Sequence, residues 1–224
     1  MTVRRLITAA ALTLAAGCTP VQPSGGQTGV PVAAVPQPAV SVGSPVDGRW
    51  GRAGEPGSTP AGDHHRLGKA TPMNQWAVDL RVPAGTPVVF GVAADHGTVT
   101  AEITQIVDGD ACRAGGGGDF VTVGLYHEGV LLGRVTYAHL RRDRKLRVGS
   151  PVAPKAVLGT VAALDGENTG GPACWTGPHV HLELRSETGG ACWRDRAPGT
   201  RVRRGEVVGF VSGPLGRSPT VCAR

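Results

Sequence analysis

The clearest pattern of apolar and polar positions lies in residues 176–184, Thr-Gly-Pro-His-Val-His-Leu-Glu-Leu. In a β-strand, side chains two residues apart point to the same face. The alternation therefore predicts a strand that buries its aliphatic side chains and presents its two histidines on the opposite face. The aliphatic residues are Val180, Leu182 and Leu184, and the histidines are His179 and His181. Two neighbouring imidazoles are what a metal site with an adjacent acid–base group requires.

A second pattern recurs three times and predicts the fold class. Each unit opens on glycine and reaches a second glycine-bearing segment within about eight to twelve residues, as expected for a strand, a turn and another strand. No stretch after residue 20 shows helical periodicity over a helical length. Gly 35, Pro 18 and only 4% aromatic residues favour turns and short strands. We expect a mostly β fold, an antiparallel β-sandwich built from stacked hairpins, with few or no helices outside the signal peptide. The units begin at residues 85–88, 149–152 and 199–202 and continue to residues 97–99, 159–161 and 209–211.

The first 18 residues have the composition of an export signal. Arg4 and Arg5 form a positive segment, which an apolar run follows as far as Ala16. Gly17 and Cys18 close a segment that resembles a bacterial lipoprotein cleavage site. We expect export and lipidation of Cys18, with anchoring on the outer face of the cytoplasmic membrane. If Cys18 is not acylated, the protein is secreted.

The cysteine count agrees with this interpretation, because five cysteines in an exported chain leave one odd thiol. With Cys18 acylated, four remain, which suits two disulfides in an oxidising compartment. Four cysteines allow three connectivities, and the sequence does not choose between them. A zinc site made of all four is disfavoured because the chain has no Cys-x-x-Cys pair. The pairing that we take as the expectation is Cys174–Cys192 with Cys112–Cys222.

Residues 19–47 are predicted to form a disordered tether. Residues 19–46 contain no charged residue and are dominated by Pro, Gly, Gln, Ser and Val. Such a segment cannot bury enough apolar surface to offset its ordering entropy. The predicted organisation is a signal peptide over residues 1–18, the tether over 19–47 and one domain over 48–224.

Removal of residues 1–17 takes away two arginines and lowers the formal net charge from +6 to +4, and this excess gathers in two basic segments, residues 141–147 and 194–204. We interpret both segments as solvated surface loops. The alternative interpretation is that their charge attracts the protein to an anionic cell wall or membrane surface. Export and a low aromatic content argue against nucleic acid as a partner. The sequence does not define an oligomeric state.

Four segments of the chain together resemble the lysostaphin/LytM-type zinc endopeptidases, which cut bacterial cell-wall peptides. The resemblance is to the branch with a long loop between the first two metal ligands, and it extends over roughly residues 49–211. Besides the His-Val-His strand, its segments are Asp-His-His at 63–65, Asn-Gln-Trp-Ala-Val-Asp-Leu at 74–80 running into Pro-Ala-Gly-Thr-Pro-Val at 83–88, and Thr-Tyr-Ala-His-Leu at 136–140.

The resemblance implies a Zn²⁺ ion bound by two histidines and one aspartate. Asp79 and His181 match the second and third ligands of the family. The commonest family pattern places the first histidine four residues before the aspartate, where this chain has Gln75. In the long-loop branch this ligand lies further upstream. We therefore expect His65 as the first ligand, with His64 as the alternative.

The resemblance also implies two catalytic histidines that do not bind the metal, His139 and His179. Zinc with three protein ligands keeps a position for water, whose pKa it lowers toward about 7. One imidazole accepts the water's proton and passes it to the leaving amine, while the other donates a hydrogen bond to the oxyanion. We assign His139 as the base and His179 as the oxyanion stabiliser, with the reverse order left open.

The expected function is hydrolysis of peptide bonds in the stem or cross-bridge peptides of bacterial peptidoglycan. The Gly-x-Ser-x-Gly elbow of serine hydrolases and the His-Glu-x-x-His helix of many metalloproteases are both missing from the sequence. The alternative is a non-catalytic member of the same fold that binds the wall or activates another wall hydrolase. Whether His64 or His65 reaches the metal decides between the two.

Overall fold

The computed structural model describes residues 38–52, 77–109, 118–163, 178–187, 190–194, 196–211 and 220–222. In these ranges the chain forms strands and turns without a helix, which confirms the mostly β fold. The same ranges contain no helix that is long and apolar enough to cross a membrane. The predictions for residues 1–37 lie outside the described residues. So do those for Cys18, His64, His65, Cys112 and Cys174.

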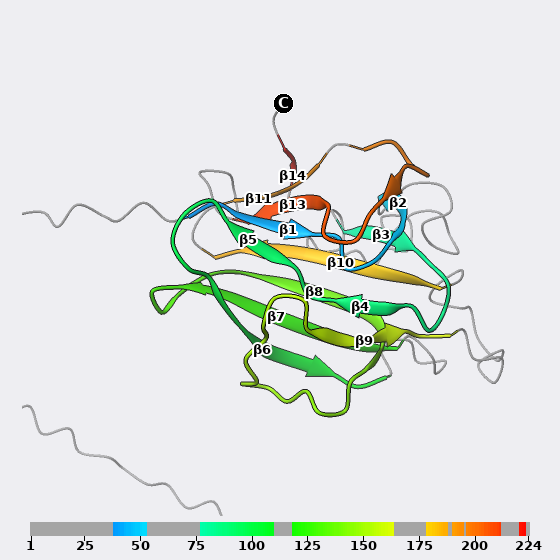
Figure 1. The fold of residues 1–224 in the computed structure, drawn as a ribbon, viewed down its shortest axis with the longest axis horizontal. Coiled ribbons are helices and arrows are strands. Elements are labelled where there is room, and N and C mark those ends of the chain that lie inside the picture. Colours follow the sequence, from blue (N-terminus) through cyan, green and yellow to red (C-terminus); the bar gives the residue numbers. More distant parts are fainter. Residues whose placement is uncertain are drawn as a thin grey trace, which may run out of the picture. The chain divides into compact units, whose positions relative to one another are not determined.

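The larger of the two sheets formed by the described residues, drawn in Figure 1, contains Asp79, His139, His179 and His181 of the predicted site. Its nine strands are all paired antiparallel, with the order β12-β2-β3-β10-β8-β7-β6, and β9 pairs with both β8 and β4. The strands are β2 (Gly48–Arg52), β3 (Val78–Arg81), β4 (Pro87–Val89), β6 (Thr100–Val107), β7 (Asp119–His127), β8 (Val130–Arg142), β9 (Val157–Val161), β10 (His179–Ser186) and β12 (Arg201–Val202).

The smaller sheet has the strand order β14-β11-β13-β1-β5. Its pairings are antiparallel except for the parallel pair of β11 with β14. Its strands are β1 (Val40–Gly43), β5 (Val92–Ala94), β11 (Ala191–Trp193), β13 (Val207–Val211) and β14 (Thr220–Val221).

The core lies between the two sheets, and the aliphatic face of β10 contributes to it as predicted. Val180, Leu182 and Leu184 are all at most 1% exposed. Leu184 packs against Gly209 of β13, where an added Cβ would lie 2.7 Å from its side chain. Burial of each such side chain stabilises the fold by roughly 1.5–3 kcal/mol. The opposite face of β10 is therefore free to carry polar chemistry.

The three repeated units share one turn. Gly85, Gly149 and Gly199 have φ values of 80°, 84° and 79°, and in each case the next residue donates a backbone hydrogen bond to the carbonyl three residues earlier. Glycine at the third position of such a turn is typical of type II geometry. These units do not close hairpins on themselves, because β12 pairs with β2 while β13 pairs with β1 and β11. The first and third units lead from the larger sheet to the smaller one, from β4 to β5 and from β12 to β13, whereas the second unit ends in β9 of the larger sheet. The consecutive pairs of β6, β7 and β8 supply the hairpins.

The predicted boundary of the tether at residue 47 is wrong, because β1 lies inside that segment. Val40 and Val42 are fully buried, and β1 pairs with both β13 and β5. The alternating Val-Ser-Val-Gly sequence places both valines on the core face of a central strand. The folded domain therefore begins before residue 40, and the lack of charged residues over the described part of this segment, residues 38–46, agrees with its burial.

The predicted disulfide pairing is also wrong. Cys192 is bonded to Cys222, which excludes both Cys174–Cys192 and Cys112–Cys222. The cause is the parallel pairing of β14 with β11, which brings the end of the chain back beside Cys192. The Cys222 N–H donates to the Trp193 carbonyl, and this fixes the two cysteines at a Cα–Cα distance of 4.8 Å.

Replacing Cys222 with serine is expected to lower the free energy of unfolding by about 3–4 kcal/mol, the loop-closure value for a 30-residue separation. Denaturant unfolding of Cys192→Ser, Cys222→Ser and the double variant measures the effect. Because one bond joins these cysteines, the double variant should be no less stable than either single variant. Additive losses would show that the cysteines belong to different bridges.

Candidate active site

Two neighbouring strands bring Asp79 and His181 together. In the antiparallel pair of β3 with β10, His181 lies directly opposite Asp79. Both side chains are buried, and His181 Nδ1 lies 3.0 Å from Asp79 Oδ1. His179 shares the same face, with its Nε2 3.8 Å from the same oxygen. The predicted strand and its histidine face are therefore present, and residues about 100 positions apart converge on one point.

His181 lies between two carboxylates. Its Nδ1 contacts Asp79, and its Nε2 lies 3.0 Å from Oε1 of Glu183, two residues further along β10. Burial lowers the pKa of His181, but the hydrogen bonds to Asp79 and then to Glu183 outweigh it and raise the pKa to about 10. The protonated imidazolium form of His181 is thus favoured at neutral pH. If His181 were to hold a metal ion, it would first have to lose a proton.

His139 reaches the same face through a β-bulge. Along β8, Tyr137 is fully buried in the core, so strict alternation would turn His139 toward the core as well. The pairing of β7 with β8 slips here, since Asp119 pairs with Leu140 and Val121 pairs with Tyr137. The extra residue on β8 lets Leu140 return to the core, and His139 has the left-handed φ of 62°. Bulges of this kind re-aim side chains beside active sites.

The three histidine rings form one cluster. The ring centroid of His139 lies 4.6 Å from that of His179 and 6.0 Å from that of His181. His139 and His179 are 8% and 4% exposed. The fold therefore places His139 and His179 beside the Asp79–His181 pair, and from there they can exchange protons with a reacting group next to it.

Gly118 holds the bulge from the side of β7. A Cβ on Gly118 would lie 2.9 Å from His139 Cα and 2.8 Å from both the His139 carbonyl carbon and the Leu140 nitrogen, so no other residue fits there. The sequence offered no sign of this role, because Gly118 is the last of four consecutive glycines.

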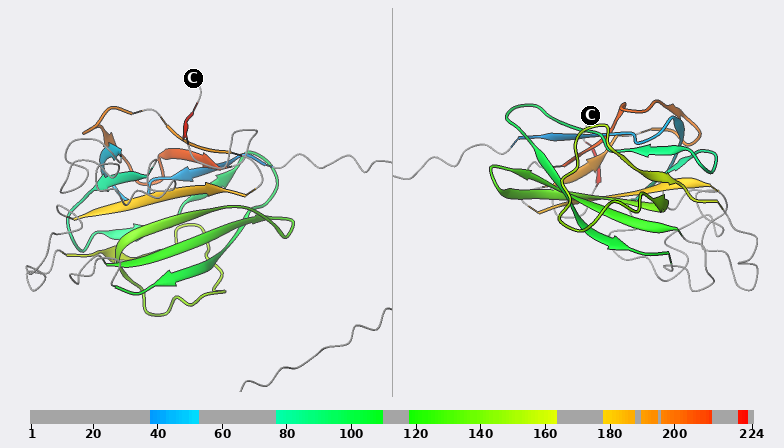
Figure 2. Two further views of the ribbon diagram at one scale, coloured as in Figure 1. Left: turned by 180° about the vertical axis from the view of Figure 1, so that it is seen from behind. Right: turned by 60° about the horizontal axis from the view of Figure 1, so that its bottom comes forward.

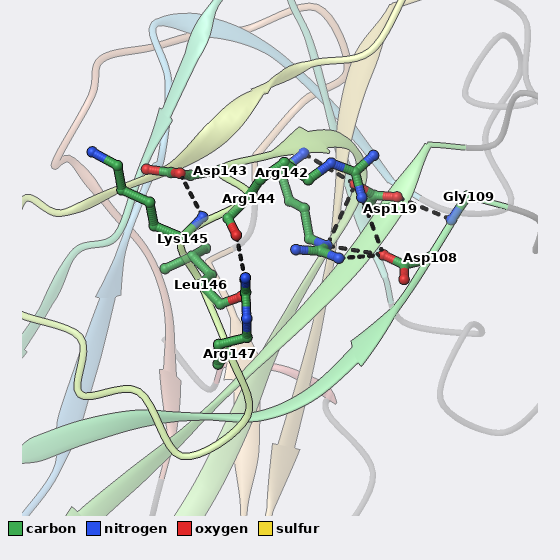
Figure 3. Close-up of polar contacts among 9 residues, drawn as sticks. All are labelled: Asp108, Gly109, Asp119, Arg142, Asp143, Arg144, Lys145, Leu146 and Arg147. Atoms are coloured by element: carbon green, nitrogen blue, oxygen red, sulfur yellow. Dashed lines mark hydrogen bonds and ion pairs between the residues drawn. The ribbon is translucent and has the colours of Figure 1, made fainter.

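An ion pair between the largely buried side chains of Arg142 and Asp119 joins β8 to β7 near the bulge, as Figure 3 shows. Asp119 accepts hydrogen bonds from the backbone N–H groups of Gly109 and Arg142, at 3.0 and 3.2 Å. The Arg142 side chain is 10% exposed, and its guanidinium lies between Asp119 and Asp108, with Nη2 2.6 Å from Asp108. The start of β7 is thereby tied to the end of β8, three residues beyond His139.

The chemistry and spacing of the Asp79–His181 pair fit a zinc ion. Two ligands of one tetrahedral zinc, each bound at about 2.0–2.1 Å, lie about 3.3 Å apart, close to the 3.0 Å between Asp79 Oδ1 and His181 Nδ1. Glu183 provides the outer carboxylate that commonly orients a ligating imidazole. Among the described residues no group of three His, Cys, Asp or Glu side chains is arranged to hold a metal. The expected first ligand, His65 or His64, lies outside those residues.

Comparison with known proteins gives matches among solved structures alone. No family model matches the chain, and no curated protein matches it. A crystal structure of a peptidase M23 from Pseudomonas aeruginosa is 24% identical, with a TM-score of 0.38 over 64% of this chain and 45% of the other. The solution structure of lysostaphin is 19% identical, with a TM-score of 0.34 over 69% and 48%. The chain thus spans less than half the length of either protein.

Proposed function

We propose that this protein is a zinc-dependent endopeptidase that hydrolyses peptide bonds in bacterial cell-wall peptidoglycan. The observation that carries the proposal is the convergence of a buried aspartate and three buried histidines on one sheet face. Asp79 and His181 would hold the metal together with His65 or His64. A bound zinc ion would polarise the scissile carbonyl and make a water molecule a better nucleophile.

Two histidine side chains are assigned the proton transfer and the stabilisation of the developing negative charge. His139 is assigned to take the proton of the attacking water and to return it to the amine that leaves when the C–N bond breaks. His179 is assigned to donate its N–H to the carbonyl oxygen, where negative charge develops. Glu183 contacts the Nε2 atom of His181, on the side of the ring away from Asp79, and this contact fixes the orientation of the ring.

Metal analysis of the purified protein, combined with digestion of isolated cell walls, tests the proposal. We expect about one equivalent of zinc, release of wall peptides, and loss of that release in a chelator with recovery after zinc is added back. Mass spectrometry of the released fragments identifies the bond that is cut. A protein that binds walls but neither retains zinc nor releases peptides would instead be a wall-binding module or an activator.

A further inference from the structure

A polar groove continues from the candidate active site along the same sheet face. Its volume is about 650 Å³, within the range of ligand-binding pockets. Its lining comes from β10, β8, β7 and β6, which lie side by side in Figure 2 (left), together with Glu187 just after β10. Glu183, the carboxylate that contacts His181, is part of the lining. The groove therefore begins where the histidine cluster ends.

The middle of the groove offers hydrogen-bonding groups. Thr136 lies opposite Glu183 in the pairing of β8 with β10, and its hydroxyl lies 3.0 Å from that of Thr122. Thr104 and Gln105 of β6 complete this part of the lining. A hydroxyl has one donor and two acceptor positions, so both threonines keep capacity for a ligand after bonding each other. Apart from Leu184, the described lining residues are polar or charged, which suits an extended polar ligand such as a peptide.

The far end of the groove carries an excess of positive charge. Arg134 and Arg185 lie opposite each other in the β8–β10 pair, and both contact a single carboxylate, Glu187. Arg134 and Arg185 are 32% and 47% exposed at their side chains, so both guanidinium groups remain open to a ligand. The other carboxylate of the groove, Glu183, is engaged by His181. Because these two guanidinium groups share one protein carboxylate, they can also donate charge-assisted hydrogen bonds to a carboxylate of a ligand.

We infer that this groove is a specificity subsite that binds a free carboxylate of the substrate peptide through Arg134 and Arg185. Arg185 is four residues beyond His181 on the same strand, which places the two about 13 Å apart along β10. An extended peptide with its scissile bond at the histidine cluster would reach the guanidinium pair with a group about four residues away. The inference rests on the proposed function, because that function places the scissile bond of the peptide at the histidine cluster. Binding of a peptide in the groove does not itself require cleavage.

Binding of two synthetic peptides tests the subsite. One is an extended acidic peptide with a free carboxylate, and the other is the same peptide with that carboxylate amidated. Calorimetry with the full protein is expected to give at least tenfold tighter binding of the acidic peptide, as charge-assisted hydrogen bonds allow. Arg134→Gln and Arg185→Gln should each remove most of this preference. Arg201→Ala, which deletes an exposed arginine of β12 away from the groove, should keep it.

The outcomes separate the subsite from the catalytic proposal. Equal affinities for the two peptides, or a preference that survives both substitutions, would overturn the subsite even in an active enzyme. A preference that depends on the arginines would support it even in a preparation that cleaves nothing, in which case the proposed function fails alone.

Discussion

Replacing His181 with alanine is expected to abolish both zinc retention and release of wall peptides. The substitution removes one of the two proposed metal ligands, whose side chains lie 3.0 Å apart, and leaves a buried carboxylate without its imidazole. Glu183→Gln is expected to have a smaller effect, since it keeps His181 as the proposed metal ligand and changes only the group that contacts its Nε2. Loss of such an outer carboxylate typically weakens metal binding about 10–100-fold. Zinc content after dialysis and peptide release measure both variants.

A surface pair provides the matched control. His96 also lies beside an aspartate, with its Nδ1 2.7 Å from Asp95 Oδ1, but both side chains are about half exposed. His96→Ala should retain zinc and activity at the level of the unmodified protein. If His181→Ala keeps stoichiometric zinc while it remains folded, the assignment of His181 as a ligand is wrong.

Replacing His139 with alanine is expected to leave zinc bound and to lower the rate of peptide release by about 10²–10⁴, the usual contribution of a general acid–base group. The bulge aims His139 at the cluster without making it part of the Asp79–His181 pair. Zinc content and the pH–rate profile together separate its role from a structural one. The rising limb of the profile should flatten in the variant if His139 is the base.

The control for loss of a buried imidazole is His127→Ala. His127 is 6% exposed at the other end of β7, where its Nδ1 lies 3.1 Å from the Thr98 carbonyl oxygen. Its removal tests whether the loss of any packed histidine slows the reaction. Equal rate losses in the His127 and His139 variants would remove His139 from the mechanism. If His179→Ala rather than His139→Ala flattens the profile, the two roles are exchanged.

The sequence predicted the parts of the site that follow strand alternation. His179 and His181 were placed correctly, because their strand keeps the period of two from Val180 to Leu184. Once β3 pairs with β10, that regularity is enough to bring Asp79 into position. The resemblance to the endopeptidase family supplied the roles, which alternation alone does not contain.

Other parts depend on departures from regularity that no local pattern reveals. The bulge moves His139 out of phase with its neighbours on β8, so a period of two predicts the wrong face for it. Composition predicts a tether over residues 40–43, whereas the alternation of Val40 and Val42 is typical of the strand β1 that the structure contains. The Cys192–Cys222 bond follows from the parallel pairing of β11 with β14, two strands that are far apart in the sequence. The number of cysteines does not predict such long-range contacts.

Glu183 would link the two proposed binding events, because one carboxylate belongs to both the histidine cluster and the groove. A ligand that changes the contact of this carboxylate with His181 is expected to change the affinity of the proposed site for zinc. Thermodynamic reciprocity then requires the metal to change the affinity for that ligand by the same factor. Peptide affinities measured with and without zinc should therefore differ by the same ratio as zinc affinities measured with and without peptide.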